Sequence, residues 1–407
     1  MKDLLITDPG GITKSEAFLD GGCRVVSRSG LHPTEVLLIE NMPRLPSGLS
    51  AALVAGNRTG AVAMALASRF PSAATACHIL DIHHARAVGR NLAANGFDFS
   101  FFADPGVKAR ADFCGLTDDA STRFSLHCTS EIPSGGYGAA LFMASARSVT
   151  AELILDQLCG IHRNLAEGGV CLMACEGDRG FMFKQIKALF GGMTVLNDQK
   201  GFFCVIARKR KPVNRERDFS AEFEVSLPGV PPVRMVSLPG VFCHRRPDAG
   251  GLALAEVAAR ELRPGLRVLD IGCGCGIVGC LLAVSQPDTR VTFLDSSARA
   301  LAAAGRNIAA LGLKKAELVL SDTGGGGNGY HLALGNAPYF SDFRIARLFA
   351  ETARSALLPH GVCMMVAKSA RPLAETQEEL FGNVEVVPRR GYGVVRSVCP
   401  AGTVQSR

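Results

Sequence analysis

The chain has 407 residues, of which 47% are hydrophobic, and this is enough for two or three domains of ordinary size. The composition excludes a mainly disordered protein, and no stretch reaches the roughly 18 uninterrupted apolar residues of a membrane span. The first residues lack the basic and apolar regions of a secretory signal, so we expect a cytoplasmic protein. The net charge of +7 favours a polyanionic partner.

The fourteen cysteines do not have the spacing of a metal site. No Cys-x-x-Cys pair is followed by a second pair or by histidines, so we expect no structural zinc. Thiols without such a pattern are typical of a protein that is kept reduced. Cys273 and Cys275 lie inside a glycine-rich turn, where their small size is the simpler explanation.

The N-terminal half repeats the plan of the C-terminal half. The turn Gly56–Gly60 aligns with Gly272–Gly276 at an offset of 216 residues, and at the same offset Arg90–Gly96 aligns with Arg306–Gly312. Two later segments also have counterparts in the same order, with loops of different length. We therefore predict a tandem of two related α/β domains.

The N-terminal copy differs at the positions where chemistry would occur. Arg58 replaces the central glycine, Gly274, and Val54 replaces Asp270. An arginine side chain at that place would project into the space where a cofactor lies against the backbone. We therefore predict that residues 1–207 form a degenerate domain with a structural or RNA-binding role.

A basic, proline-containing linker is predicted at residues 208–235. Its run Arg208–Arg217 holds six basic residues and one acid. Two interpretations remain open, a solvated connection between domains and a contact with an RNA backbone, and both can hold for the same segment.

Short aliphatic runs alternate with helical stretches in the predicted C-terminal domain, residues 236–407. The predicted strands are Arg267–Ile271, Arg290–Leu294, Ala316–Leu320, His331–Leu334, Val362–Ala367 and Val394–Cys399. The intervening segments, such as Ser297–Leu311 and Phe343–Leu357, carry Ala and Leu at helical spacing. This alternation predicts a Rossmann-like α/β domain, with a largely parallel sheet covered by helices on both faces.

The first of these strands runs directly into a glycine-rich turn, after which Ile277 can begin a helix. Ligands of open α/β sheets bind at this carboxyl edge of the strands. Gly272, Gly274 and Gly276 permit positive φ and let the backbone approach a ligand such as the amino-acid part of S-adenosylmethionine (SAM). The turn alone is a weak signal, since dinucleotide enzymes use similar turns.

Three acids sharpen the prediction of a nucleoside cofactor. Asp270 precedes the turn and suits a role near the methionine ammonium, directly or through water. Asp295 ends the next strand, where a carboxylate can accept both ribose hydroxyls, and Asp322 ends the third strand, where it can accept the adenine amino group. A helix N-cap is the alternative for each acid, and for Asp322 both readings stay open.

The segment Asn336-Ala337-Pro338-Tyr339 follows the fourth strand. The amide oxygen of Asn336 and a strand-end carbonyl can accept hydrogen bonds from an exocyclic amine, while Tyr339 can stack on a base. Because a sulfonium leaving group is already activated, alignment would supply most of the acceleration. An Asn-Pro turn is the alternative, but its place in this domain favours Asn336, Pro338 and Tyr339 as catalytic residues.

These motifs resemble the two-domain ribosomal RNA guanine-N2 methyltransferases of the methyltransferase small-domain class. The resemblance implies a degenerate N-terminal domain, an active C-terminal domain, SAM as cofactor, and ribosomal RNA or a ribosomal subunit as partner. It also implies that Phe242 and Asp248 lie near the cofactor pocket. The family pattern is Asn-Pro-Pro-aromatic, whereas Ala337 replaces the first proline here and loosens the loop.

The leading prediction is SAM-dependent methylation of the exocyclic N2 amine of a guanine in ribosomal RNA. The same chemistry on adenine N6 or on a protein glutamine stays open, because each target presents a planar amine. A non-catalytic SAM-binding protein associated with RNA or the ribosome is a third reading, motivated by Ala337. A dinucleotide oxidoreductase would use Asp295 but would leave Asn336 and its neighbours without a role. The sequence carries no signal for an oligomeric state.

Overall fold

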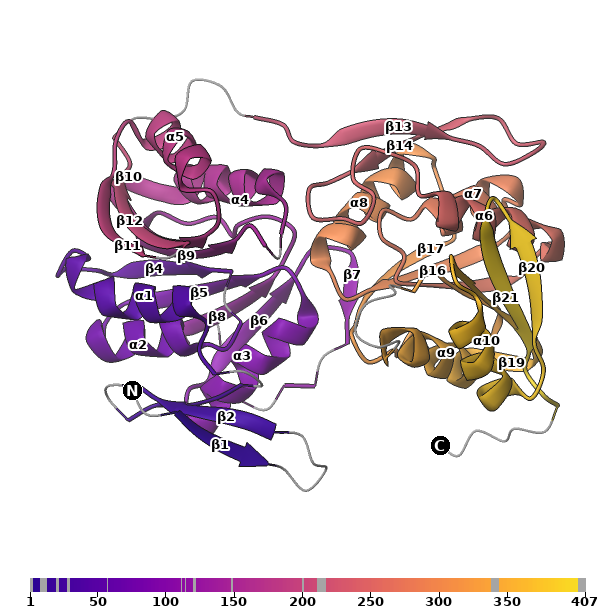
Figure 1. Cartoon of the computed structure of the whole chain (residues 1–407), viewed down its shortest axis with the longest axis horizontal. Coiled ribbons are helices and arrows are strands. Elements are labelled where there is room, and N and C mark those ends of the chain that lie inside the picture. Colours follow the sequence, from indigo (N-terminus) through magenta and orange to yellow (C-terminus); the bar gives the residue numbers. More distant parts are fainter. Residues whose placement is uncertain are drawn as a thin grey trace. The chain divides into compact units, whose positions relative to one another are not determined.

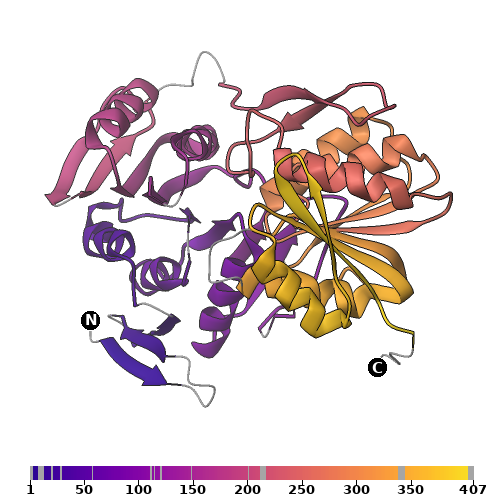
Figure 2. The same cartoon turned by 45° about the vertical axis from the view of Figure 1, so that its right-hand side comes forward.

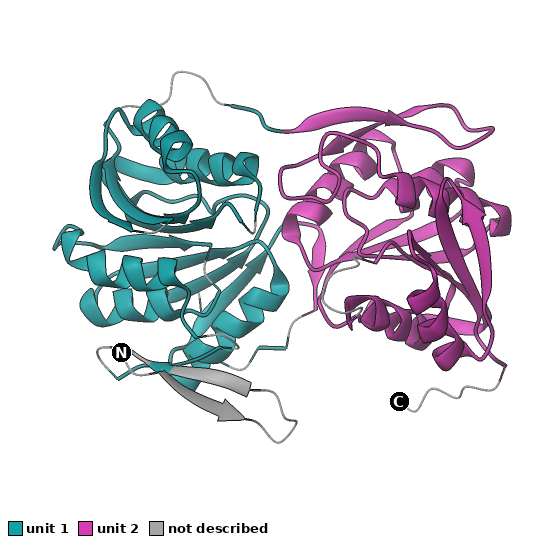
Figure 3. Ribbon diagram, in the orientation of Figure 1, with its two compact units in different colours: residues 1–104, 111–219 teal, residues 105–110, 220–407 magenta. Residues whose placement is uncertain are grey.

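The computed structural model (Figure 1) describes residues 3–7, 13–19, 22–27, 30–56, 58–110, 112–113, 115–119, 122–147, 149–199, 201–210, 217–337 and 344–401. It separates into two compact units (Figure 3). Unit 1 comprises Met1–Asp104 and Ala111–Phe219, and unit 2 comprises Pro105–Arg110 and Ser220–Arg407. A short segment of the N-terminal half therefore belongs to the C-terminal unit.

Unit 1 is built on one eight-stranded sheet with helices on its faces. In spatial order its strands are β11 (Thr194–Gln199), β12 (Phe202–Arg208), β10 (Leu165–Glu176), β9 (Tyr137–Ser145), β4 (Ala51–Ala55), β5 (Ala74–Ile79), β8 (Phe124–Cys128) and β6 (Phe99–Ala103). Its helices are α1 (Pro33–Asn41), η1 (Met42–Arg44), α2 (Ala61–Arg69), α3 (Ile82–Ala94), α4 (Ala151–Asn164) and α5 (Arg179–Phe190). A small antiparallel sheet precedes them, with β1 (Asp3–Thr7), β2 (Thr13–Phe18) and β3 (Arg24–Ser27).

Unit 2 repeats this plan. In spatial order its strands are β20 (Glu385–Arg389), β21 (Tyr392–Val398), β19 (Leu357–Ala367), β18 (Tyr330–Gly335), β15 (Arg267–Ile271), β16 (Arg290–Asp295), β17 (Ala316–Leu320) and β7 (Val107–Ala109). Its helices are α6 (Ala249–Ala258), η2 (Ala259–Glu261), α7 (Ile277–Ser285), α8 (Ala298–Ala310), α9 (Arg344–Ala356) and α10 (Arg371–Phe381), and they cover both faces of the sheet (Figure 2). A two-stranded hairpin, β13 (Ala221–Val225) and β14 (Val233–Ser237), precedes them.

The predicted fold class, a tandem of two Rossmann-like α/β domains, is confirmed. From β19 to β17 the pairing in unit 2 is parallel, while β21 runs antiparallel to β19. The central strands are mainly apolar and buried, since both faces are covered, and this is why their limits follow the predicted ranges closely. The main extension is β19, which begins at Leu357 and not at Val362.

Two segments differ from the sequence-based expectation. The predicted linker 208–235 contains the hairpin strand β13 and the start of β14, because these two runs pair with each other in antiparallel register. Within that linker, residues 211–216 lie outside the described residues, and so does most of the predicted RNA contact. The second difference is β7, which pairs in parallel with β17 at the edge of unit 2 and not with unit 1. The predicted boundaries at 207 and 236 themselves stay a prediction.

One buried asparagine fastens the glycine turn of unit 2 to the hairpin. Asn307, on α8, donates hydrogen bonds of 2.8 Å to the backbone carbonyls of Val236 and Cys275. It also accepts one of 2.7 Å from the N–H of Val236. All polar atoms of this side chain are thereby used, which a buried amide requires.

The same clamp is present in unit 1. Asn91, on α3, donates to the carbonyls of Val26 and Thr59 at 3.1 and 2.7 Å and accepts from the N–H of Val26 at 3.1 Å. The Arg-Asn repeat seen in the sequence therefore marks a structural element that both copies retain.

The third strand position distinguishes the two sheets. In unit 2, the strand that follows α8 is β17, and it lies next to β16. In unit 1, the strand that follows α3 is β6, which lies at the edge, while β8 occupies the place beside β5. The adenine side of a cofactor site would be formed at this position, so the strand order of unit 1 differs from that of unit 2 there.

Among the helices of the described residues, none combines the length and apolar character needed to cross a membrane.

Candidate active site

The glycine turn of unit 2 leaves one open face. Gly272, Gly274 and Gly276 have φ of +66°, +57° and +83°. A Cβ on Gly272 would lie 2.5 Å from the ring of Phe349, and one on Gly276 would lie 3.2 Å from Phe293, so these glycines are required by packing. A Cβ on Gly274 would meet nothing closer than 3.9 Å. The central glycine therefore exposes backbone to a space that a ligand can occupy.

Asp295 ties this turn to the next strand. Its Oδ2 accepts a 3.0 Å hydrogen bond from the N–H of Gly274, and its Oδ1 accepts a 2.9 Å bond from the N–H of Ser297. The N-cap of α8 is Ser297 and not Asp295. The helix-cap alternative is therefore wrong for this acid, whose half-buried carboxylate lies beside the open face of the turn.

Asp270 lies under the same turn and is buried. Its Oδ2 accepts a 3.0 Å hydrogen bond from the N–H of Gly279, in the first turn of α7, whose N-cap is Gly276. Burial raises the pKa of Asp270 to about 7, and the nearby charge of Asp295 adds to the increase. A cationic ligand at the turn would favour the ionised carboxylate, so the predicted role near an ammonium group is physically consistent.

Asp322 is the second residue of the loop 321–329, which is followed by β18 and not by a helix. The N–H of Ser321, the residue before Asp322, donates a 3.0 Å hydrogen bond to the carbonyl of Asp295. Asp295 and Asp322, the two predicted cofactor acids, therefore lie at the ends of adjacent strands. The glycines of this loop are closely packed. A Cβ on Gly324 would meet Thr352 at 2.8 Å, and one on Gly326 would meet the Leu269 side chain at 2.7 Å.

Asn336 follows β18 and is held by a carboxylate. Its Nδ2 donates a hydrogen bond to Oδ2 of Asp248. Asp248 is the N-cap of α6 and accepts from the N–H groups of Gly250 and Gly251 at 3.1 and 2.8 Å. Because a carboxylate accepts and does not donate, the amide nitrogen of Asn336 must face Asp248. The amide oxygen is then left to accept a hydrogen bond from another group.

The remaining predicted residues fall in two classes. Phe242 is 69% exposed, and the side chain of its neighbour Val241 is the nearest atom to the open face of Gly274. The segment before the domain therefore borders the turn, as the resemblance implies. Pro338 and Tyr339 lie outside the described residues.

Ala337 is buried among the alanines of α9. It is 3% exposed and belongs to the same apolar cluster as Ala346 and Ala350. The residue that replaces the family's first proline thus packs in the core, directly after Asn336.

Tyr392 is a site neighbour that the sequence motifs did not indicate. A Cβ on Gly250 would lie 3.3 Å from the ring of Tyr392 and 3.4 Å from Nδ2 of Asn336, so ring and amide face the same small space. Tyr392 begins β21, at the end of a hairpin whose Arg390 pairs with the buried Glu256 of α6 at 2.6 Å. No local signal connects these residues, because they lie more than fifty positions apart.

The turn of unit 1 has different side chains around it. Glu35, on α1, is buried and accepts hydrogen bonds of 2.6 Å from the hydroxyl of Thr59 and 2.9 Å from the N–H of His32. Burial raises the pKa of Glu35. Arg58, the counterpart of Gly274, is exposed. At the central position of its turn, unit 1 therefore carries a side chain where unit 2 has a bare glycine.

Cysteines play no visible part in the site chemistry. Burial raises the pKa of Cys275 to about 12 and also raises that of Cys273, so both thiols stay protonated. Within the described residues, no group of three or more His, Cys, Asp or Glu side chains could hold a metal ion.

Comparison with known proteins agrees with this geometry. Residues 232–396 match the family described as methyltransferase small domain. A ribosomal RNA small subunit methyltransferase C from Vibrio parahaemolyticus is 32% identical over 186 residues, which are 44% of this chain and 52% of that protein. One from Mannheimia succiniciproducens is 30% identical over 40% of this chain and 49% of that protein. The chain thus spans about half the length of the curated relatives it matches.

The two-domain arrangement also has a structural counterpart. A solved 16S rRNA N2 methyltransferase from T. thermophilus, in complex with AdoMet and guanosine, superposes with a TM-score of 0.70 over 98% of both chains at 21% identity. At this identity the likeness shows a shared fold. Together with the family match, it confirms the resemblance to the two-domain ribosomal RNA methyltransferases.

Proposed function

We propose that this chain, whose residues 232–396 match the methyltransferase small domain, methylates the exocyclic N2 amine of a guanine in ribosomal RNA. The observation that carries the proposal is the amide of Asn336, which Asp248 holds at the carboxyl end of β18, next to β15, the strand that leads into the glycine turn. In this arrangement an amine acceptor and a nucleoside site are adjacent.

The described residues fit SAM as the cofactor. The open backbone face at Gly274 can receive its amino-acid part, with Asp270 near the ammonium group, while Asp295 and Asp322 can accept hydrogen bonds from ribose and adenine. When bound, SAM supplies an activated methyl group on a sulfonium. These side chains are predictions as cofactor ligands, supported by their position on adjacent strand ends.

Transfer of the methyl group requires that the accepting amine be oriented, and it requires no strong base. An exocyclic amine that donates to the amide oxygen of Asn336 is held with its nitrogen lone pair directed away from the hydrogen bonds. Tyr392 lies next to this amide and adds a ring surface. Proximity and alignment then supply most of the rate acceleration. Pro338 and Tyr339 are proposed to complete the grip on the base.

Ribosomal RNA, naked or in a subunit, is the proposed partner, and the cytoplasm is the proposed location because the substrate is there. The curated relatives are named as small-subunit RNA methyltransferases, which supports RNA over a protein glutamine. Adenine N6 is the nearest alternative, since it presents the same planar amine. A SAM-binding protein without activity remains the alternative that the Ala337 replacement suggests.

The test is transfer of radiolabelled methyl from SAM to unmodified ribosomal RNA and to each ribosomal subunit. We expect label that digests to N2-methylguanosine. Asn336→Ala should lower the rate by roughly 100-fold or more while SAM binding is retained. Label in N6-methyladenosine or in protein would change the target, and SAM binding without any product would support the non-catalytic alternative.

A further inference from the structure

The edge strand of unit 2 comes from the middle of unit 1's sequence. Residues 105–110 leave unit 1 after β6, form β7, and return to unit 1 at residue 111. In unit 2, β7 pairs in parallel with β17, with Val107 opposite Leu318 and Ala109 opposite Leu320. Because the strands are parallel, the carboxyl end of β7 lies at the sheet edge where the candidate cofactor site is built.

Arg110 is the residue that this strand delivers to the site. Its N–H donates a 2.9 Å hydrogen bond to the carbonyl of Leu320, the last residue of β17. Its side chain then extends over the loop 321–329, since its Cδ lies 3.3 Å from the position of a Cβ on Gly325. The stem of Arg110 thus lies against a glycine three residues after Asp322.

The loop beneath Arg110 is packed from the other sides as well. Gly324 has no room for a side chain because of Thr352 on α9, and Gly326 has none because of Leu269 on β15. At the start of the loop, the N–H of Ser321 donates a hydrogen bond to the carbonyl of Asp295. Gly324 and Gly326 are buried, whereas Gly325 and Arg110 are both exposed, so the stem of Arg110 lies against the outer surface of the loop. The stem of Arg110 is therefore the contact that β7 makes with the solvent-facing side of the loop.

We propose that Arg110 is a positioning residue of the cofactor site: its alkyl stem holds the loop 321–329 in the conformation that presents Asp322 to the adenine ring. The inference rests on the proposed function, because it takes SAM as the ligand. It assigns the N-terminal half of the sequence a part in cofactor binding, although unit 1 has lost its own site.

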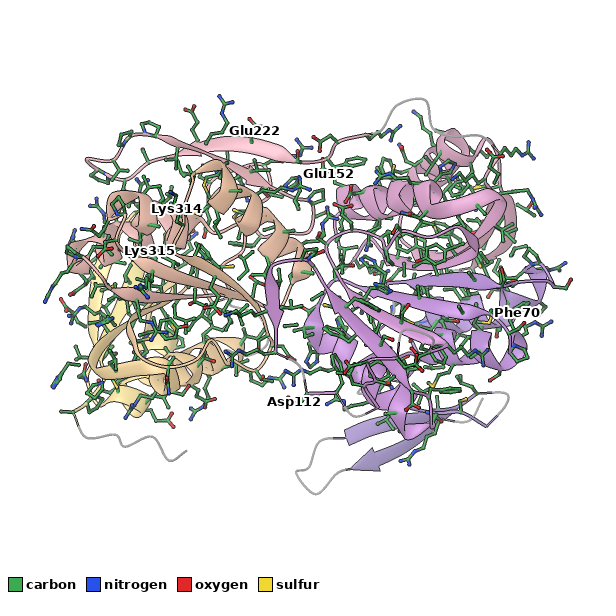
Figure 4. All side chains as sticks on the ribbon, turned by 180° about the vertical axis from the view of Figure 1, so that it is seen from behind. Phe70, Asp112, Glu152, Glu222, Lys314 and Lys315 are labelled. Atoms are coloured by element: carbon green, nitrogen blue, oxygen red, sulfur yellow. The ribbon has the colours of Figure 1, made fainter. Side chains whose placement is uncertain are left out.

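Lys108 provides a matched control. It lies in β7, two residues before Arg110, which directly follows the strand. Lys108 pairs with Glu317 at 2.7 Å. It lines a groove together with Leu313 and Lys314, of which Lys314 is labelled in Figure 4. The lining of that groove includes no residue of the loop 321–329. Replacing Lys108 therefore changes the charge of the strand without touching the loop.

The experiment measures SAM binding by titration calorimetry on the full chain. Arg110→Ala should weaken SAM binding roughly threefold to tenfold. Arg110→Met, which retains an unbranched stem without the charge, should bind SAM as the unchanged chain does, and so should Lys108→Ala. Thermal unfolding of each variant establishes that unit 2 is folded.

A second measurement isolates the adenine contact. S-adenosylhomocysteine and its inosine analogue, which lacks the 6-amino group, differ only where Asp322 is proposed to bind. The unchanged chain should prefer the adenine compound, and Arg110→Ala should reduce that preference, since a misplaced acceptor discriminates less. If Arg110 had only a structural role, Arg110→Ala would weaken the binding of both compounds by the same factor. The ratio of the two affinities would then stay unchanged.

The outcomes are distinguishable. Equal SAM affinity of Arg110→Ala and the unchanged chain overturns the inference, as does an equal loss in Lys108→Ala. A loss in Arg110→Met as large as in Arg110→Ala overturns the role of the stem. If the unchanged chain itself does not bind SAM, the proposed function fails, and that result is separate from the others.

Discussion

The two glycine turns share a scaffold and differ in the space in front of it. Asn91 and Asn307 make the same three hydrogen bonds, each fastening its turn to a preceding strand. In unit 2 the turn then exposes Gly274 to open space. In unit 1 Arg58 stands at that place, and Glu35 lies buried beside Thr59.

This difference separates the requirements of folding from those of binding. Folding needs the asparagine clamp, because a buried turn with unpaired carbonyls would be costly. Binding needs empty space and bare backbone, which stabilise nothing by themselves. A duplicated domain can therefore keep its fold while the residues around its turn change.

Gly274→Arg should have the largest effect, since it places the unit 1 residue in the unit 2 turn. The φ of +57° is unfavourable for an arginine, and the side chain would occupy the open face. We expect SAM affinity to fall by at least roughly 100-fold, or about 3 kcal/mol. Calorimetric titration measures this. Arg58→Gly is the control and should leave SAM binding unchanged; an unaltered affinity in Gly274→Arg would contradict the placement of the cofactor.

Asp248→Asn should impair methyl transfer more than cofactor binding. An asparagine offers both a donor and an acceptor, so it no longer dictates which way the amide of Asn336 faces. We expect kcat to fall roughly 10- to 100-fold with a smaller change in SAM affinity. Asp288→Asn, at an exposed carboxylate that pairs with Lys315 (Figure 4), is the matched control. Normal kcat in Asp248→Asn would show that Asn336 needs no such support.

Asn91→Ala and Asn307→Ala should destabilise the two units similarly. Each substitution removes three buried hydrogen bonds and leaves backbone groups unpaired, which costs about 3 kcal/mol. Thermal unfolding of both variants measures the loss. Only Asn307→Ala should also weaken SAM binding, because only its turn holds the cofactor. If both variants changed the SAM affinity equally, the two units would be functionally equivalent. That result would contradict the difference between the two glycine turns.

Asp270 should produce a pH dependence of stability. In the unfolded chain its carboxyl ionises near its ordinary pKa of about 3.9, whereas in the folded protein the pKa is about 7. Between these values folding takes up a proton, so the free energy of unfolding falls as pH rises. This group alone contributes a fall of about 1 kcal/mol per pH unit between pH 5 and 6. Denaturant titrations at several pH values measure the free energy of unfolding, and the difference between Asp270→Asn and the unchanged chain isolates the contribution of Asp270. If the free energies of both proteins changed with pH in parallel, a raised pKa of Asp270 would be contradicted.

The sequence predicts the parts of this molecule that are locally encoded. The strand Arg267–Ile271 and its turn are recognisable because a buried parallel strand is a continuous apolar run and the turn needs glycine at left-handed positions. The asparagine repeat is visible because both copies keep it. These features define the fold and the cofactor edge.

The features that were not predicted depend on distant pairing. Val107–Ala109 is too short to reveal that it joins β17, about 210 residues later. The hydrogen bond between Asp248 and Asn336 joins residues 88 positions apart. Tyr392 reaches the site only because β21 pairs with β19. In each case the partner is chosen by the folded sheet and not by neighbours in the chain.

The number of SAM molecules bound per chain tests the central comparison most directly. Titration calorimetry of the full chain should give one site, which Gly274→Arg abolishes and Arg58→Gly leaves unchanged. Two sites per chain, or one site that survives Gly274→Arg, would contradict the conclusion that unit 2 alone retains the cofactor site.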